Sequence, residues 1–230
     1  MTRTTNARIA GFTFLFYIGI GITGMFLNNR ATNAQGAAAK LARIAEHASD
    51  VRAGVLLTLL ECFSALVLAV TLYGITRDED HELAMLAMTC RVGEGILGAM
   101  GIPEALRRLW LATAGAGEGG PDAATASALG AVLFMPGANV PTGAIFFAVG
   151  STLFSYLMLR GRIIPAALAW LGVFASVVLV LGLPMQMVGF IRGPVTWYLW
   201  MPALVFELTL GPWLMIKGVS MTQRGQARRV

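Results

Sequence analysis

Charged residues are scarce in this sequence. They make up 13% of its 230 residues, whereas a typical soluble domain carries about 25%. Hydrophobic residues make up 57%, and the mean hydropathy is +0.71. This balance excludes an ordinary soluble domain. It predicts an integral membrane protein whose first partner is the lipid bilayer.

Cysteine and histidine are equally rare, with two of each. Cys62 and Cys90 fall in apolar stretches, where buried thiols usually serve as small packing residues. His47 and His81 fall in loops that we expect on opposite sides of the membrane, which excludes a shared metal or haem site. We therefore predict no metal and no cofactor. The net charge of +5 fits anionic lipid and the positive-inside rule, and no motif indicates a nucleic-acid partner.

Six apolar stretches are long enough for a transmembrane helix, which needs about 20 residues. The expected spans are 9–27, 53–75, 83–101, 140–159, 165–190 and 196–216. The first is longer than the apolar region of a signal peptide, so we interpret it as a retained span. The predicted fold is all-α: a polytopic transmembrane helix bundle that forms a single domain over residues 1–230.

Two shorter segments also have helical patterns. Segment 36–47 places Leu41, Ile44 and Ala45 at amphipathic spacing, which predicts a helix on the membrane surface or a cap on the bundle, with a plain linker as the alternative. Segment 123–135 has too few residues to cross the bilayer unaided. We expect it to be interfacial or re-entrant, and a seventh span is the alternative.

Six spans place both termini on one side of the membrane. That side carries nine Lys and Arg residues and the other seven, while Arg91 falls inside a span. The long loops of the second side count for less in the positive-inside rule. We therefore expect a multi-pass protein of the cytoplasmic membrane with both termini in the cytoplasm.

Four ionisable residues interrupt the spans: Glu61, Arg91, Glu94 and Glu207. Each costs about 3 kcal/mol or more at membrane depth, so such residues face protein or water. At about 1.5 Å per helical residue, all four lie between the outer third and the midplane of the bilayer. Arg91 and Glu94 are three residues apart and share one helix face. Helices at matching depths can therefore bring the four groups to one site.

These four residues are the candidate catalytic groups. Three carboxyl groups against one guanidinium leave excess negative charge in a low dielectric, so we expect at least one to be protonated at neutral pH. Glu61 and Glu207 are then candidate general acids or proton carriers, with Arg91 and Glu94 as the fixed charge pair. The alternative is purely structural, since intramembrane polar residues also hold helices together.

Aromatic and amide residues near the same depth are candidates for binding a lipophilic small molecule. Their π faces could stabilise a cation, and their amides could orient a ligand. The candidate substrate-binding residues are Phe63, Asn139, Gln186, Trp197, Trp200 and Phe206.

Short motifs occur in a characteristic order along the chain: Arg91–Glu94, Ile145–Gly150, Tyr156–Arg160, Ile164–Pro165, Leu168–Gly172, Phe206–Leu208 and Trp213–Gly218. In this order they resemble the bacterial multi-spanning family called domain of unknown function 4386, from about Ala7 to Gly218. The resemblance implies six or seven spans in one domain and no particular activity. It also implies that Glu61, Arg91, Glu94 and Glu207 fall on polar positions of the family.

Three functions are open at this point. The first is acid-catalysed cyclisation or isomerisation of an isoprenoid-like substrate, in which Glu61 or Glu207 is the general acid; the size and layout are loosely similar to small membrane terpene cyclases. The second is a small proton-coupled transporter that uses the same acids. The third is a non-catalytic accessory or structural membrane protein. The sequence does not predict an oligomeric state.

Overall fold

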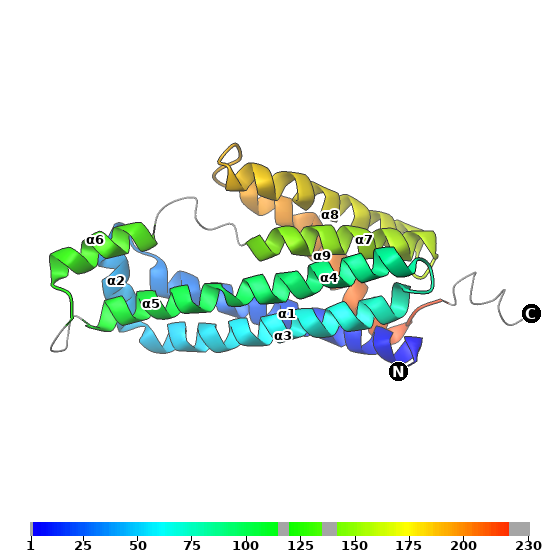
Figure 1. Cartoon of the computed structure of the whole chain (residues 1–230), viewed down its shortest axis with the longest axis horizontal. Coiled ribbons are helices and arrows are strands. Elements are labelled where there is room, and N and C mark those ends of the chain that lie inside the picture. The colour runs from blue at the N-terminus through cyan, green and yellow to red at the C-terminus, as the bar shows by residue number, and fades with distance from the viewer. Residues whose placement is uncertain (1, 115–119, 135–141, 221–230) are drawn as a thin grey trace, which may run out of the picture.

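The computed structural model describes residues 2–114, 120–134 and 142–220 of the chain. Every regular element in these three ranges is a helix, so the predicted all-α class is confirmed (Figure 1). The helices are α1 (Arg3–Thr32), α2 (Ala37–Glu46), α3 (Ala48–Thr76), α4 (His81–Ala99), α5 (Gly101–Ala114), α6 (Ala123–Leu133), α7 (Thr142–Arg160), α8 (Ala166–Met187) and α9 (Val195–Ile216).

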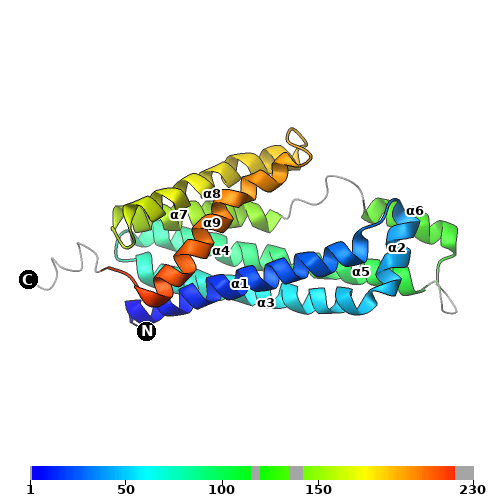
Figure 2. The ribbon, with the colours of Figure 1, turned by 180° about the vertical axis from the view of Figure 1, so that it is seen from behind.

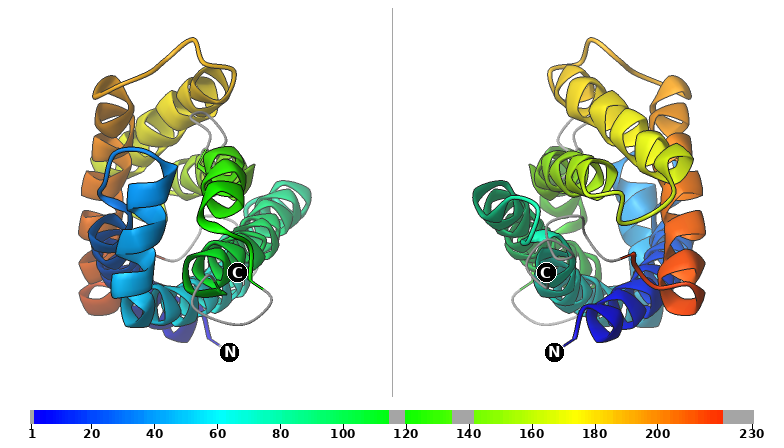
Figure 3. Two further views of the ribbon diagram at one scale, coloured as in Figure 1. Left: turned by 90° about the vertical axis from the view of Figure 1, so that its left-hand side faces the viewer. Right: turned by 90° about the vertical axis from the view of Figure 1, so that its right-hand side faces the viewer.

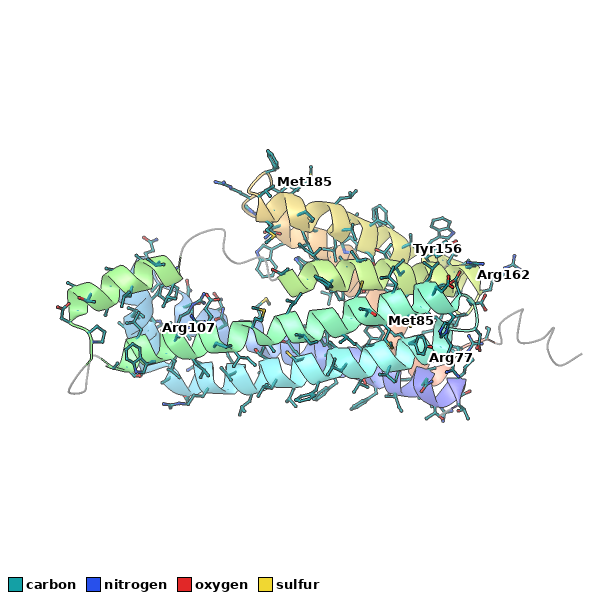
Figure 4. The ribbon with its side chains drawn as sticks, in the orientation of Figure 1. Arg77, Met85, Arg107, Tyr156, Arg162 and Met185 are labelled. Atoms are coloured by element: carbon teal, nitrogen blue, oxygen red, sulfur yellow. The ribbon has the colours of Figure 1, made fainter. Side chains whose placement is uncertain are left out.

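Six helical stretches are long and apolar enough to cross a membrane, as predicted. Five of them are α1, α3, α7, α8 and α9, and α4 and α5 together form the sixth, a stretch of 34 residues from His81 to Ala114. The apolar helix α6 has 11 residues, too few to cross a bilayer core of about 30 Å. Large apolar side chains such as Met85, Tyr156 and Met185 lie exposed on the outside of the bundle (Figure 4).

The six long helices form a closed ring. Each packs against two neighbours in the cyclic order α1, α3, α4, α7, α8, α9, and α9 returns to α1; α7 makes a smaller additional contact with α3. The end-on views of Figure 3 show the helices arranged around a common axis. Side chains that point inward therefore meet partners from helices that are not neighbours in the ring.

The seam between α1 and α9 depends on two glycines. A Cβ atom added at Gly11 would lie 2.5 Å from the carbonyl oxygen of Gly211 and 2.8 Å from the backbone nitrogen of Met215. Backbones approach this closely only where no side chain separates them, which is the usual role of small residues between transmembrane helices. Helices α1 and α9 thus close the ring through direct contact between their backbones.

The ring is longer on one side than on the other. At about 1.5 Å per residue, the 30 residues of α1 and the 34 residues of the α4–α5 stretch reach about 45 and 51 Å, well beyond a bilayer core of about 30 Å. Figures 1 and 2 show that α1, α3 and α5 continue past the ends of α7, α8 and α9, toward α2 and α6. We call α2, α5, α6 and the adjoining ends of α1 and α3 the cap.

One expected boundary differs clearly from the structure, because no helix was predicted after Gly101. The third span was expected to end at Gly101, but helix resumes there as α5 and continues to Ala114. Pro103 does not interrupt α5 because it lies in the first turn, where a backbone N–H has no partner within the helix. Segments 36–47 and 123–135 correspond to α2 and α6, which pack against α5 and against each other.

The opposite end of the bundle, which we call the terminal end, is held together by polar contacts. Arg3 Nη2 donates a hydrogen bond to the carbonyl oxygen of Ile75 (2.7 Å), and its Nη1 donates to that of Ser220 (3.4 Å). Arg160 Nη1 binds Asp80 Oδ2 at 3.1 Å. Both described ends of the chain lie here, as six crossings require. Arg77 and Arg162 lie at this end in Figure 4, and Arg107 lies at the cap.

Candidate functional site

The inside of the ring is filled by apolar side chains toward the terminal end. A cluster of buried apolar side chains contributed by all of the ring helices fills it, and we call this cluster the apolar plug. Its members are Ala7, Ala10, Phe14, Leu68, Leu72, Ile75, Ala87, Phe154, Met158, Ile163, Ile164, Leu168, Ala169, Phe206, Leu210 and Leu214. Most of these residues lie on the terminal side of Arg91, so the plug separates Arg91 from that end of the protein.

Arg91 on α4 lies at the centre of the ring and has 0% exposure. It is ten residues into α4, about 15 Å along the helix from the terminal end. Its Nη1 donates a hydrogen bond of 2.6 Å to Glu94 Oε2 on the same helix. The pair that the sequence predicted three residues apart is therefore a direct, buried ion pair.

Glu207 on α9 faces the same guanidinium from across the ring. Its Oε1 lies 3.9 Å from Arg91 Nη2, close enough for an ion pair and too far for a hydrogen bond. Nε and Nη2 of Arg91 have no hydrogen-bond partner within the described ranges. Glu207 is therefore held near Arg91 by charge, without a direct hydrogen bond.

Two aromatic rings cover the guanidinium. Its Cζ lies 4.8 Å from the ring centroid of Phe147 on α7 and 5.8 Å from that of Phe14 on α1. Both distances fit cation–π contacts, which gain strength where water is excluded. Phe147 in turn stacks on Trp200 of α9 at 6.0 Å. The arginine is thus held by aromatic faces as well as by carboxylates.

Tyr17 on α1 completes the contacts of Glu94. Its hydroxyl group donates a hydrogen bond of 2.8 Å to Glu94 Oε1, so both carboxylate oxygens of Glu94 have a donor. We did not predict Tyr17 from the sequence. Its position was the available signal, because a tyrosine in the interior of a span, away from the aromatic belts at the interfaces, needs a partner for its hydroxyl group.

Glu61 on α3 lies beside this cluster and nearer the cap. It is half-buried against α1, where an added Cβ at Gly21 would lie 2.7 Å from Glu61 Oε1. Gly21 is one helical turn beyond Tyr17 on α1. Glu61 is close enough to Glu94 for the two carboxyl groups to interact electrostatically, although it makes no ion pair with any described residue.

The structure brings some predicted binding residues toward the cluster and not others. Trp200 stacks on Phe147, whose ring lies over the Arg91 guanidinium, whereas Phe206 is buried with its ring against Gly172 of α8. Gln186 lies in the last turn of α8, and its buried Oε1 atom has no hydrogen bond to any described residue. Phe63 and Trp197 are both 62% exposed on the outer surface. Asn139 lies outside the described residues.

The site is therefore a polar centre made by residues from three ring helices. We call Tyr17, Arg91, Glu94 and Glu207 the Arg91 cluster, with Glu61 as its neighbour. Hollows of about 330 and 340 Å³ lie at the terminal end and at the cap, and neither is lined by a member of the cluster. The described side chains form no group of three or more His, Cys, Asp or Glu that could hold a metal ion.

The comparison with protein families identifies the chain. Residues 9–218, nearly its whole length, match the family described as Domain of unknown function (DUF4386). The chain belongs to this family. This member of the family is an all-helical, multi-pass membrane protein. The description of the family assigns no activity. Searches of curated proteins and of solved structures found no match to the chain.

Proposed function

We propose that the Arg91 cluster binds protons reversibly and that this DUF4386 protein is a small proton-coupled membrane protein. One observation carries the proposal: a single buried guanidinium contacts two carboxyl groups directly, and the carboxyl group of Glu61 lies beside them on the cap side. With every group ionised, the Arg91 cluster and the neighbouring Glu61 would together carry an excess of two negative charges, one of them at the buried centre of the ring. Proton uptake by a carboxyl group removes the cost of such buried charge.

The three carboxyl groups have different surroundings, which supports different roles. Glu94 accepts hydrogen bonds from both Arg91 and Tyr17, so its ionised form is the best stabilised of the three. Among the side chains that the structure describes, the polar contact of Glu207 is the longer 3.9 Å one with the arginine. Glu207 is therefore the carboxyl group that exchanges its proton at the centre, and Glu94 is the fixed counter-charge of Arg91.

The direction of access follows from the packing of the ring. The apolar plug lies between the cluster and the terminal end, whereas Glu61 lies on the cap side and is only half-buried. Protons would thus reach Glu207 from the cap side by way of Glu61. The location of the protein in the cytoplasmic membrane, with both termini in the cytoplasm, stays a prediction from the charge count.

The test is pH-difference infrared spectroscopy on the protein in lipid bilayers. A carboxyl group that gains a proton in a dry site gives a carbonyl band that is separate from the bands of hydrated carboxylates. We expect wild-type protein to show such a band as the pH falls, and we expect Glu207→Gln to lose it. Glu61→Gln should slow its appearance after a pH jump.

The matched control is Glu82→Gln, which removes an exposed carboxyl group from the first turn of the same helix as Arg91. It should leave the buried band unchanged. A wild-type protein without any titrating buried carboxyl group, or a band that survives in Glu207→Gln, would reject the proposal.

A structural role is the second candidate, and one observation favours it. The hydrogen bond from Tyr17 to Glu94 joins α1 to α4, and the ion pair of Arg91 with Glu207 joins α4 to α9. Each contact links helices that are not neighbours in the ring. A pure lock of this kind predicts that Glu207→Gln weakens the fold while no buried carboxyl group titrates in the wild type.

Acid catalysis on a lipophilic substrate has less support. The face of Phe147 that a substrate cation would need already holds the guanidinium of Arg91, and two of the aromatic candidates, Phe63 and Trp197, lie on the outer surface. The cyclase hypothesis and its substrate-binding residues remain predictions from the sequence.

A further inference from the structure

A second polar site lies in the cap, away from the Arg91 cluster. Three helices, α1, α2 and α5, and the residue that follows α6 meet there around a hollow of about 340 Å³. The hollow is lined by Asn28, Thr32, Lys40, Arg108 and Phe134. Two of these five residues are cations and none is an acid, so the lining of the hollow is positively charged and can attract an anion.

The two cations flank one aromatic ring. Lys40 Nζ lies 5.2 Å from the ring centroid of Phe134, and Arg108 Cζ lies 5.3 Å from the same centroid. Lys40 makes no hydrogen bond or ion pair in the part of the chain that the structure describes. All three donors of its ammonium group are therefore available.

Arg108 is fixed in place yet still has a free donor. It pairs with Glu104 one turn earlier and donates a hydrogen bond of 3.1 Å to the carbonyl oxygen of Leu133. Its Nε is buried without a partner among the described residues. The side-chain amide of Asn28 also makes no hydrogen bond with the described residues, which adds a neutral donor to the hollow.

The hollow lies at the outer edge of the headgroup layer of a bilayer. Asn28 lies about 21 Å from Phe14 along α1, and Arg108 lies about 26 Å from Arg91 along α4 and α5. With Arg91 near the midplane, both distances fall at or just beyond the headgroups, which end about 20–22 Å from the midplane. Basic pockets at this level suit phosphate groups.

We propose that the hollow is a binding site for a phosphate group, held by Lys40 and by Arg108 Nε. Phosphate oxygens accept several charge-assisted hydrogen bonds at once, which matches the unused donors of the site. The recognition chemistry is the same for the phosphate of a lipid headgroup and for a free phosphate anion. The site is separate from the proposed proton site and does not depend on it.

The test is thermal unfolding of the purified full-length protein in detergent. The ligands are phosphatidylglycerol, diacylglycerol with the same acyl chains and no phosphate, and inorganic phosphate against chloride at equal ionic strength. We expect phosphatidylglycerol to stabilise the protein more than diacylglycerol. In Lys40→Gln, half-maximal stabilisation should need about ten times more of the phosphate ligand, the loss expected for one charge-assisted hydrogen bond.

The matched control is Arg107→Gln. It removes the same charge from the next residue of α5, whose side chain is exposed and does not line the hollow. This variant should respond to phosphate as the wild type does. A response to phosphatidylglycerol alone identifies a lipid headgroup, and a response to inorganic phosphate as well identifies a site open to free anions. Equal responses in Lys40→Gln and Arg107→Gln, or no response in the wild type, would overturn the proposal.

Discussion

Arg91 and Glu207 face each other across the inside of the ring, with 3.9 Å between Nη2 and Oε1, although their helices are not neighbours. The distance is longer than the 2.6 Å between Arg91 and Glu94. The two carboxyl groups therefore share one guanidinium unequally. This inequality, together with the packing around it, leads to the following predictions.

Arg91→Gln should destabilise the protein by about 3 kcal/mol, because it leaves two buried carboxyl groups without their cation. A double-mutant cycle in unfolding experiments separates the two partners. We expect a larger coupling energy for Arg91 with Glu94 than for Arg91 with Glu207, in line with the distances. Equal couplings would contradict the division into a fixed pair and an exchanging acid.

Tyr17→Phe should cost about 1 kcal/mol, the usual worth of one hydrogen bond between transmembrane helices. The change removes only the hydroxyl group that donates to Glu94. Tyr156→Phe is the matched control, since Tyr156 is exposed on α7 and makes no side-chain hydrogen bond with the described residues. Thermal unfolding in one detergent compares the two variants, and an equal effect of both would refute the role of Tyr17.

Gly11→Ala should open the seam between α1 and α9. The new methyl group would lie 2.5 Å from the carbonyl oxygen of Gly211, so one backbone must move, at a cost of about 1–3 kcal/mol. Gly19→Ala lies on the same helix with no atom within 4 Å of the added Cβ, and it should be neutral or slightly stabilising. Unfolding experiments that rank the two variants in the reverse order would contradict the seam.

Asp80 should make stability at the terminal end depend on acid. The backbone N–H of Leu83 and the guanidinium of Arg160 both favour its ionised form, so the pKa of Asp80 lies below its usual value. A lowered pKa contributes stability above the ordinary Asp value of about 3.9, and that contribution disappears as the pH falls through the folded pKa. The stability difference between wild type and Asp80→Asn should therefore shrink below about pH 4. A constant difference across that range would show that Asp80 does not act through its charge.

Features that depend on helical periodicity and on the spacing of charges along one helix could be predicted from the sequence. Arg91 and Glu94 had to share a helix face because three residues separate them, and their contact follows directly. The depth of Glu207 along its span also placed it level with them. The identity of the neighbours across the ring could not be predicted in this way, because helix rotation and ring order depend on packing among all six helices. Phe14, Phe147 and Tyr17 were missed for that reason.

Helix α5 of the cap was missed for a different reason. Gly101 and Pro103 were read as the end of a span, since glycine and proline usually break helices. In the structure the break is confined to the junction between α4 and α5, and the helix resumes because it packs on α2 and α3. Local residue preference was overridden by tertiary contacts that the sequence alone does not display.

The closure of the ring by α1 and α9 has a consequence for biosynthesis. During translation, α4 enters the membrane well before the ribosome has made α9, so Arg91 meets the lipid without Glu207. At that stage it already has Glu94 on its own helix and, through Glu94, Tyr17 on the earlier α1. The ion pair within α4 thus compensates the charge of Arg91 in the bilayer before α9 is inserted.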